Sequence, residues 1–147
     1  MARADKTSVA ESPTAKSTAK APPQPLTMMS LFAPALGWLI PGAGHLIQKR
    51  WGRGLLLMIS VVTMFVLGVL MEGKVYAFNT GDILDILGFV GDLGAGGLYI
   101  VARALGIGLG AINLATADYG TKYIIVAGLL NIISAVDAYD IAMGKKK

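Results

Sequence analysis

The sequence contains no cysteine, one histidine and few charged residues, and each shortage removes a class of function. Without cysteine the chain has no disulfides, thiolate zinc sites, iron–sulfur clusters or cysteine nucleophiles. Charged residues make up 15% of the 147 residues, compared with about 25% in an average soluble domain. Hydrophobic residues make up 54%, and the mean hydropathy is +0.63. A soluble domain of this size could not bury so much apolar surface, so the composition predicts an integral membrane protein.

The basic charge is concentrated at the two ends of the chain. Residues 1–27 are mostly Ala, Ser, Thr, Lys and Pro without apolar periodicity, which predicts a disordered tail. Residues 145–147 are three lysines, and the sequence between the tails is slightly acidic. No folded basic face with interleaved aromatic residues is evident, so we expect no nucleic-acid partner. We expect the tails to attract anionic lipid instead.

Four apolar segments predict an all-α fold, a bundle of about four transmembrane helices within residues 28–144, since one span needs about 20 apolar residues. The segments cover residues 28–48, 54–71, 83–106 and 121–142. The third is the weakest because it contains charged residues. A second interpretation makes it one tilted span followed by an interfacial stretch over residues 105–117.

The expected orientation follows from the distribution of Lys and Arg. An even number of spans in the cell inner membrane places both basic tails in the cytoplasm. Lys49, Arg50 and Arg53 would then face outward. If Pro41 and Gly42 break the first segment so that it does not fully cross, these three residues are cytoplasmic as well.

The most distinctive string follows the first apolar segment. Proline removes a helix hydrogen bond, and the glycines permit a tight, closely packed turn. Basic and aromatic residues come next, where lipid headgroups would lie. We call the following residues the hairpin motif: Pro41, Gly42, Gly44, His45, Arg50, Arg53 and Gly54.

This motif resembles a hairpin found in small bacterial membrane proteins and is distantly similar to the TM-two domain. Paired with the C-terminal blocks Asp118–Thr121, Val126–Asn131 and Asp137–Ala142, it resembles an uncharacterised bacterial family. Ile47 stands where an aromatic residue is usual, and Lys49 where glycine is usual. The resemblance implies a multi-pass membrane protein without an established activity.

His45 is open to two interpretations. It could ligate a haem or chlorin, or relay protons. The favoured alternative is a polar residue at a helix end, hydrogen-bonded to backbone that Pro41 leaves unpaired. A lone histidine without a second His or Cys makes a weak metal site, so we expect no metal and no cofactor.

Three charged residues in the third segment share one side of a continuous helix: Asp85, Asp92 and Arg103, the polar stripe. Charged groups within a span face the protein interior or water. The stripe therefore predicts either structural contacts between helices or, less favoured, a pathway for protons or ions. We expect Asp92 to be buried and bonded to His45, Asn131 or Tyr99 of a neighbouring copy.

The last segment carries small residues at helical spacing, which allow close helix contacts. We call these the packing face: Ala127, Gly128, Asn131, Ala135 and Ala138. Asp137 and Asp140, the acidic pair, share a side of the same helix. They could bind a cation or act in acid–base chemistry, but solvated or lysine-paired carboxylates are the favoured interpretation.

No nucleophile motif, Walker loop or zinc-protease motif is present, so we expect no enzymatic activity and no catalytic residues. The leading hypothesis is a structural or assembly component that packs in the lipid bilayer as a homo-oligomer or within a larger membrane complex. An ion or small-solute pathway and a pigment- or haem-bearing subunit are the alternatives.

Overall fold

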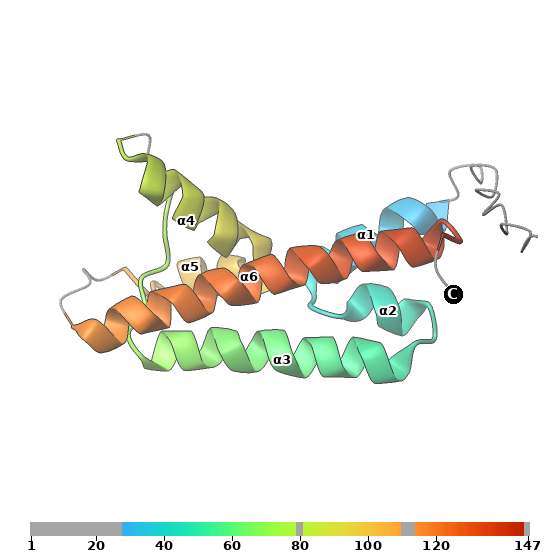
Figure 1. Ribbon diagram of the computed structural model, residues 1–147, viewed down its shortest axis with the longest axis horizontal. Helices are drawn as coiled ribbons and strands as arrows, with labels where there is room; N and C mark the ends of the chain where they lie inside the picture. The colour runs from blue at the N-terminus through green and yellow to red at the C-terminus, as the bar shows by residue number, and fades with distance from the viewer. Residues whose placement is uncertain (1–27, 79–80, 110–113, 146–147) are drawn as a thin grey trace, which may run out of the picture.

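The computed structural model describes residues 28–78, 81–109 and 114–145. The predicted disordered tail over residues 1–27 lies outside these ranges, as do Lys146 and Lys147. The described residues form helices without strands (Figure 1), which agrees with the all-α prediction. The helices are α1 (Met28–Leu39), α2 (Ala43–Ile47), α3 (Trp51–Leu70), α4 (Ile83–Gly94), α5 (Gly97–Ala104) and α6 (Ala115–Ala142).

Helix α6 is the central element. Its 28 residues make it about 42 Å long, and it packs against α3, α1 and α4. In Figure 1 α3 runs alongside α6. Helices α1 and α2 lie toward the C-terminal end of α6, and α4 and α5 toward its N-terminal end. The long helix therefore links two groups of shorter ones.

The first apolar segment is broken, which corrects the prediction of one span over residues 28–48. Helix α1 has 12 residues and covers about 18 Å, short of the roughly 30 Å of a bilayer core. Pro41 has no N–H to continue the helix. Gly42 has a φ of +77°, and a Cβ there would lie 2.2 Å from the carbonyl oxygen of Gly54. The chain therefore turns back through α2, as the alternative interpretation of Pro41 and Gly42 anticipated.

The third segment is also broken, so the polar stripe does not lie on one helix. Helices α4 and α5 meet at an angle of 111°. Gly96, at the break, has a φ of +60°, and a Cβ there would lie 1.8 Å from the carbonyl oxygen of Trp38. Asp85 and Asp92 are on α4, whereas Arg103 is on α5. The prediction of a shared stripe was wrong because the chain bends to let α1 approach.

Within the residues that the structure describes, two helices, α3 and α6, are long and apolar enough to cross a membrane, and a third span results if the bent pair α4–α5 counts as one. The prediction of about four spanning helices is therefore not confirmed. Helix α6 also begins at Ala115, earlier than the predicted residue 121. Asp118 and Lys122, one turn apart, form an ion pair on this additional turn.

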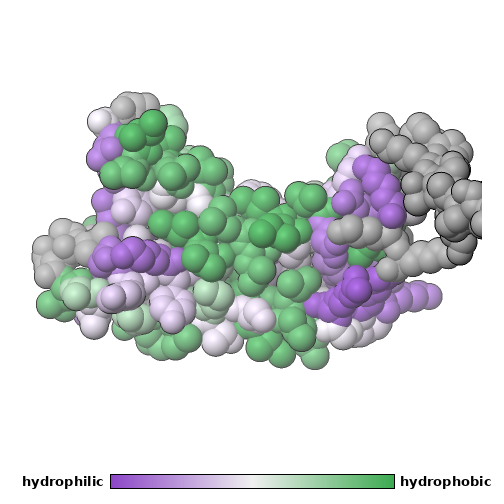
Figure 2. All heavy atoms as spheres, in the orientation of Figure 1, coloured by the Kyte–Doolittle hydropathy of each residue, from purple (hydrophilic) through white to green (hydrophobic). Residues whose placement is uncertain are grey.

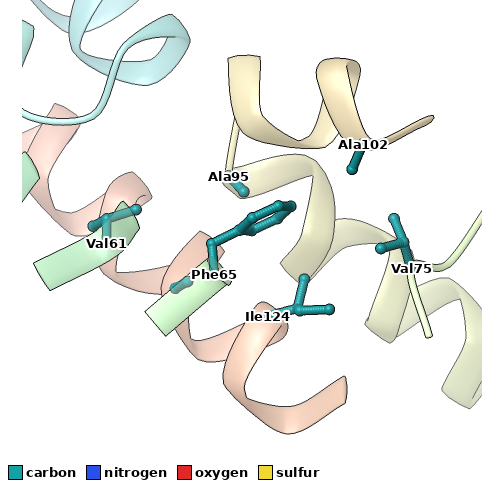
Figure 3. Packing of buried hydrophobic residues seen from close by; sticks show 7 residues of the cluster. Val61, Phe65, Val75, Ala95, Ala102 and Ile124 are labelled. Carbon is teal, nitrogen blue, oxygen red and sulfur yellow. The ribbon is translucent and has the colours of Figure 1, made fainter. Parts of the chain in front are cut away.

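One apolar cluster lies between α3, α5 and α6, with Val75 added from the loop after α3. Figure 3 shows Phe65 of α3 between Val61 of the same helix and Ile124 of α6, with Ala95 beside the Phe65 ring. Elsewhere the helices touch through glycine. A Cβ on Gly128 would lie 1.9 Å from the carbonyl oxygen of Gly91, so α4 and α6 approach at backbone distance.

Large apolar side chains lie on the outside. Leu56, Leu70, Leu87 and Ile133 are each more than 60% exposed, while His45, Asp92 and Asn131 are fully buried. Figure 2 shows an apolar middle zone along the long axis, with hydrophilic patches at both ends. This distribution is the reverse of that in a soluble domain.

Candidate functional site

The two short helices α1 and α4 end against the same residue of α6. Asn131 is fully buried, and its Nδ2 donates to the carbonyl oxygens of Trp38 at 2.9 Å and Gly94 at 3.0 Å. The indole Nε1 of Trp38 donates to the carbonyl oxygen of Leu93 at 3.1 Å. The last carbonyls of a helix have no partner within that helix. Asn131 supplies partners for the carbonyls of Trp38 and Gly94, and Trp38 adds a second donor to the carbonyl of Leu93, which also accepts the N–H of Gly96 at 3.0 Å. We call this group, Asn131, Trp38, Leu93 and Gly94, the Asn131 clasp.

A second polar group fastens the hairpin to the last turns of α6. His45 is fully buried, and its Nε2 lies 3.1 Å from Oδ2 of Asp137. Gln48 Nε2 donates to the carbonyl oxygens of Gly44 at 3.0 Å and Ala138 at 2.8 Å. The predicted bond from His45 to unpaired backbone was wrong, because the partner is a side chain of the acidic pair. The Nε2 that could ligate a haem is occupied by this contact.

The third polar group holds the loop over residues 71–78. Oδ2 of Asp92 accepts the backbone N–H of Tyr76 at 2.7 Å. The Tyr99 hydroxyl donates to the carbonyl oxygen of Tyr76 at 3.2 Å. The Thr121 hydroxyl accepts the N–H of Lys74 at 2.8 Å and donates to the carbonyl of its own helix. This loop therefore bonds to α4, α5 and α6.

Asp92 is buried as expected, but none of the expected partners, His45, Asn131 or a neighbouring Tyr99, bonds to it. Its partner is backbone in a loop. Burial and nearby carboxylates, Asp85 first among them, raise the pKa of the Tyr76 phenol, which keeps that hydroxyl neutral. Oδ1 of Asp92 has no hydrogen-bond partner among the residues that the structure describes.

The remaining predicted residues separate into exposed and packed groups. Asp85 lies 3.9 Å from Nζ of Lys74, and Asp140 lies 3.6 Å from Nζ of Lys145. Asp140 thus matches the lysine-paired interpretation, and Asp137 contacts His45. All five residues of the packing face, Ala127, Gly128, Asn131, Ala135 and Ala138, are buried.

Within the hairpin motif, Pro41, Gly42, Gly44, His45 and Gly54 are buried, while Arg53 is exposed and Arg50 is half-buried. Lys49, at the position where the resembling family has glycine, has a φ of +59°. That left-handed conformation favours glycine, which explains the usual residue. Among the described ranges, no third His, Cys, Asp or Glu joins His45 and Asp137 to complete a metal site.

Sequence reasoning missed three contributors, Trp38, Gln48 and Thr121. Each is a side chain with a hydrogen-bonding group inside an apolar segment. A buried donor or acceptor needs a partner, so a polar side chain within an apolar segment indicates a buried hydrogen bond. Their partners, however, are backbone groups in other elements, and the sequence does not identify those.

The comparisons with known proteins identify a family for this chain. The profile of a family of unknown function, DUF6677, matches residues 32–147. The chain belongs to this family, which confirms the expectation of a family without assigned activity. No curated protein and no solved structure matches the chain.

Proposed function

We propose that this protein is an integral membrane protein that acts as a structural or assembly component of a membrane complex. The observation that carries the proposal is the reversed distribution of polarity. Outside the apolar cluster around Val61, Phe65 and Ile124, the buried positions are mostly Gly, Ala and polar residues such as Asn131, Asp92 and His45. Many large apolar side chains of α3, α4 and α6 face outward. Exposed apolar surface of this extent is typical of a surface covered by lipid or by another protein.

The hydrogen bonds of the buried polar groups support a packing role. Asn131, Asp92 and Thr121 each bond to backbone of an irregular segment or a helix end. In lipid, such backbone groups need internal partners because water is absent. These side chains therefore stabilise the helix ends and the loop whose backbone groups lack partners of their own.

The distribution of basic residues supports a cytoplasmic location for the hairpin end. Contacts of His45 and Gln48 with α6 bring Lys49, Arg50 and Arg53 to the end of the bundle that also carries Lys145. In this arrangement α3 and α6 cross the membrane fully, and α1–α2 enters and leaves on the same side of it. Both tails and the hairpin then lie on one side of the membrane. The positive-inside rule assigns that side to the cytoplasm.

Membrane insertion and assembly can be tested together. Alkaline carbonate extraction of membranes should leave the protein in the pellet. Purification in a mild detergent with a mass measurement should give a defined homo-oligomer or a larger complex. Recovery as a soluble monomer without detergent would overturn the proposal.

Orientation can be tested by cysteine labelling, since the native chain has no cysteine. Lys49→Cys and Gly144→Cys should react with an impermeant maleimide from the cytoplasmic side. Glu72→Cys, at the other end of α3, should react from the opposite side. Labelling of Lys49→Cys and Gly144→Cys from opposite sides would contradict the two-crossing arrangement.

An ion pathway is the second candidate function, because Oδ1 of both Asp92 and Asn131 is buried without a partner among the described residues. Unpaired polar oxygens inside a bundle are candidate sites for water or a cation. Asp92→Asn should then abolish a proton or cation flux in vesicles while assembly persists. Under the packing role, assembly and stability are the properties that respond to substitution of Asp92.

A further inference from the structure

A groove lies on the outside of the bundle along the C-terminal part of α6, and Leu57 of α3 forms part of its wall. It has a volume of about 340 Å³. A second hollow shares Leu57 and Asp137 with it and reaches Arg53 near the start of α3. The two hollows adjoin at these shared residues. Arg53, Asp137 and Asp140 supply their charged lining, and Leu57 and Leu130 belong to their apolar lining.

The polarity changes in order along α6. Asp140, Asp137, Ser134 and Leu130 all line the groove. They are three or four residues apart and thus share one side of the helix, about one turn of roughly 5 Å each. Charged groups come first, then a hydroxyl, then aliphatic side chains. A glycerophospholipid has the same order, with a charged headgroup, ester carbonyls and acyl chains.

Ser134 provides an independent indication of a ligand. The residue is 3% exposed and lines the groove, and its Oγ has no hydrogen-bond partner within the described part of the chain. A serine within a helix commonly donates to the carbonyl four residues earlier, and a buried hydroxyl without a partner is costly. The Oγ is enclosed in this structure, so donating to an ester carbonyl at this depth requires the hydroxyl to turn toward the groove.

The charged residues of the lining select the headgroup. The exposed guanidinium of Arg53 suits a phosphate, and the carboxylates of Asp137 and Asp140 accept hydrogen bonds from an amine. His45 bonds to Oδ2 of Asp137, and Lys145 lies beside Asp140, so both carboxylates lie among hydrogen-bond donors. A choline headgroup has no N–H to donate, and a glycerol headgroup has no positive charge.

We propose that this groove binds one glycerophospholipid whose headgroup carries a phosphate and a primary amine, as in phosphatidylethanolamine. The proposal rests on the proposed location in the membrane. Arg53 contacts the phosphate, and the acidic pair accepts the amine. Ser134 donates to an ester carbonyl, and Leu57 and Leu130 pack against an acyl chain.

The test is native mass spectrometry of the full chain released from detergent with equal amounts of phosphatidylethanolamine, phosphatidylcholine and phosphatidylglycerol. Phosphatidylethanolamine should be retained in preference to the other two. Arg53→Gln should lower its retention roughly fivefold, the loss of one exposed ion pair with the phosphate. Arg50→Gln removes the same charge from a neighbouring residue outside the groove and should leave retention unchanged.

Further variants separate the headgroup from the acyl chain. Asp140→Asn should reduce the preference for phosphatidylethanolamine over phosphatidylglycerol, and Asp118→Asn at the far end of α6 should not. Val136 is 55% exposed on the groove wall. Val136→Trp should therefore fill the acyl space, lowering lipid retention without altering buried contacts.

Three results would overturn the proposal while leaving membrane insertion intact. The first is equal retention of the three lipids, and the second is equal loss in Arg53→Gln and Arg50→Gln. The third is a spontaneous disulfide dimer of Val136→Cys in membranes, which would show a second copy in the groove. Extraction of the protein by carbonate would instead contradict the proposed function itself.

Discussion

Replacing Asn131 by alanine tests whether the bundle depends on the Asn131 clasp. The substitution removes two hydrogen bonds from Nδ2, to Trp38 and to Gly94, at a fully buried position. Hydrogen bonds between helices in membranes contribute about 0.6 kcal/mol on average and up to about 1.7 kcal/mol. Two such bonds give a loss of about 1–3 kcal/mol, and the vacated amide volume adds to it.

Asn131→Asp makes the test more specific. A carboxylate keeps the size of the amide but directs an acceptor oxygen at two carbonyl oxygens, since it has no N–H donor. We expect it to lower the free energy of unfolding more than Asn131→Ala does at neutral pH. An effect that came from lost volume alone would give the opposite order.

Ser134→Ala is the matched control. Ser134 lies one turn further along α6, is equally enclosed, and its Oγ has no partner within the described part of the chain. The assay is reversible unfolding in detergent without phospholipid, for example by sodium dodecyl sulfate titration. If Asn131→Ala and Ser134→Ala differ by less than about 0.5 kcal/mol, half of the smallest expected loss, the clasp does not stabilise the fold.

Two further predictions concern the break between α4 and α5 and the loop after α3. Gly96→Ala should prevent folding or lower stability by more than about 3 kcal/mol, because the strain of a positive φ adds to the 1.8 Å approach of the new Cβ to the carbonyl oxygen of Trp38. Gly52→Ala is the control: a Cβ there has nothing within 4 Å, so the thermal midpoint should rise slightly. Asp92→Leu should lower the free energy of unfolding by about 1–3 kcal/mol, because it leaves the N–H of Tyr76 unpaired. Asp92→Asn retains an acceptor and should lower it less. Equal effects of the two variants in unfolding titrations would show that this hydrogen bond is unimportant.

The two long helices were predictable from sequence because each depends on an uninterrupted apolar run. Predicted spans over residues 54–71 and 121–142 correspond to α3 over 51–70 and α6 over 115–142. The earlier start of α6 was missed because its first turns are polar. There the ion pair between Asp118 and Lys122 stabilises helix that hydropathy does not detect.

The broken segments were harder to predict because their cause is tertiary. Among the glycines near residue 96, Gly91 and Gly94 pack against α6. Gly96 has a different role, since its positive φ and its contact with Trp38 belong to a chain reversal. Apolar composition alone does not distinguish a glycine that packs a helix from one that ends it.

The position of Asn131 within the packing face explains why the breaks and the buried amide depend on one another. A continuous helix satisfies its own carbonyls, so an asparagine facing two unbroken helices would have no acceptor for its two N–H groups. Helices that end at Leu39 and Gly94 instead leave carbonyls unpaired at the depth of Asn131. A buried amide midway along an otherwise small-residue face therefore indicates nearby helix ends. The Pro41–Gly42 and Gly94–Gly97 strings are where the sequence could have supplied them.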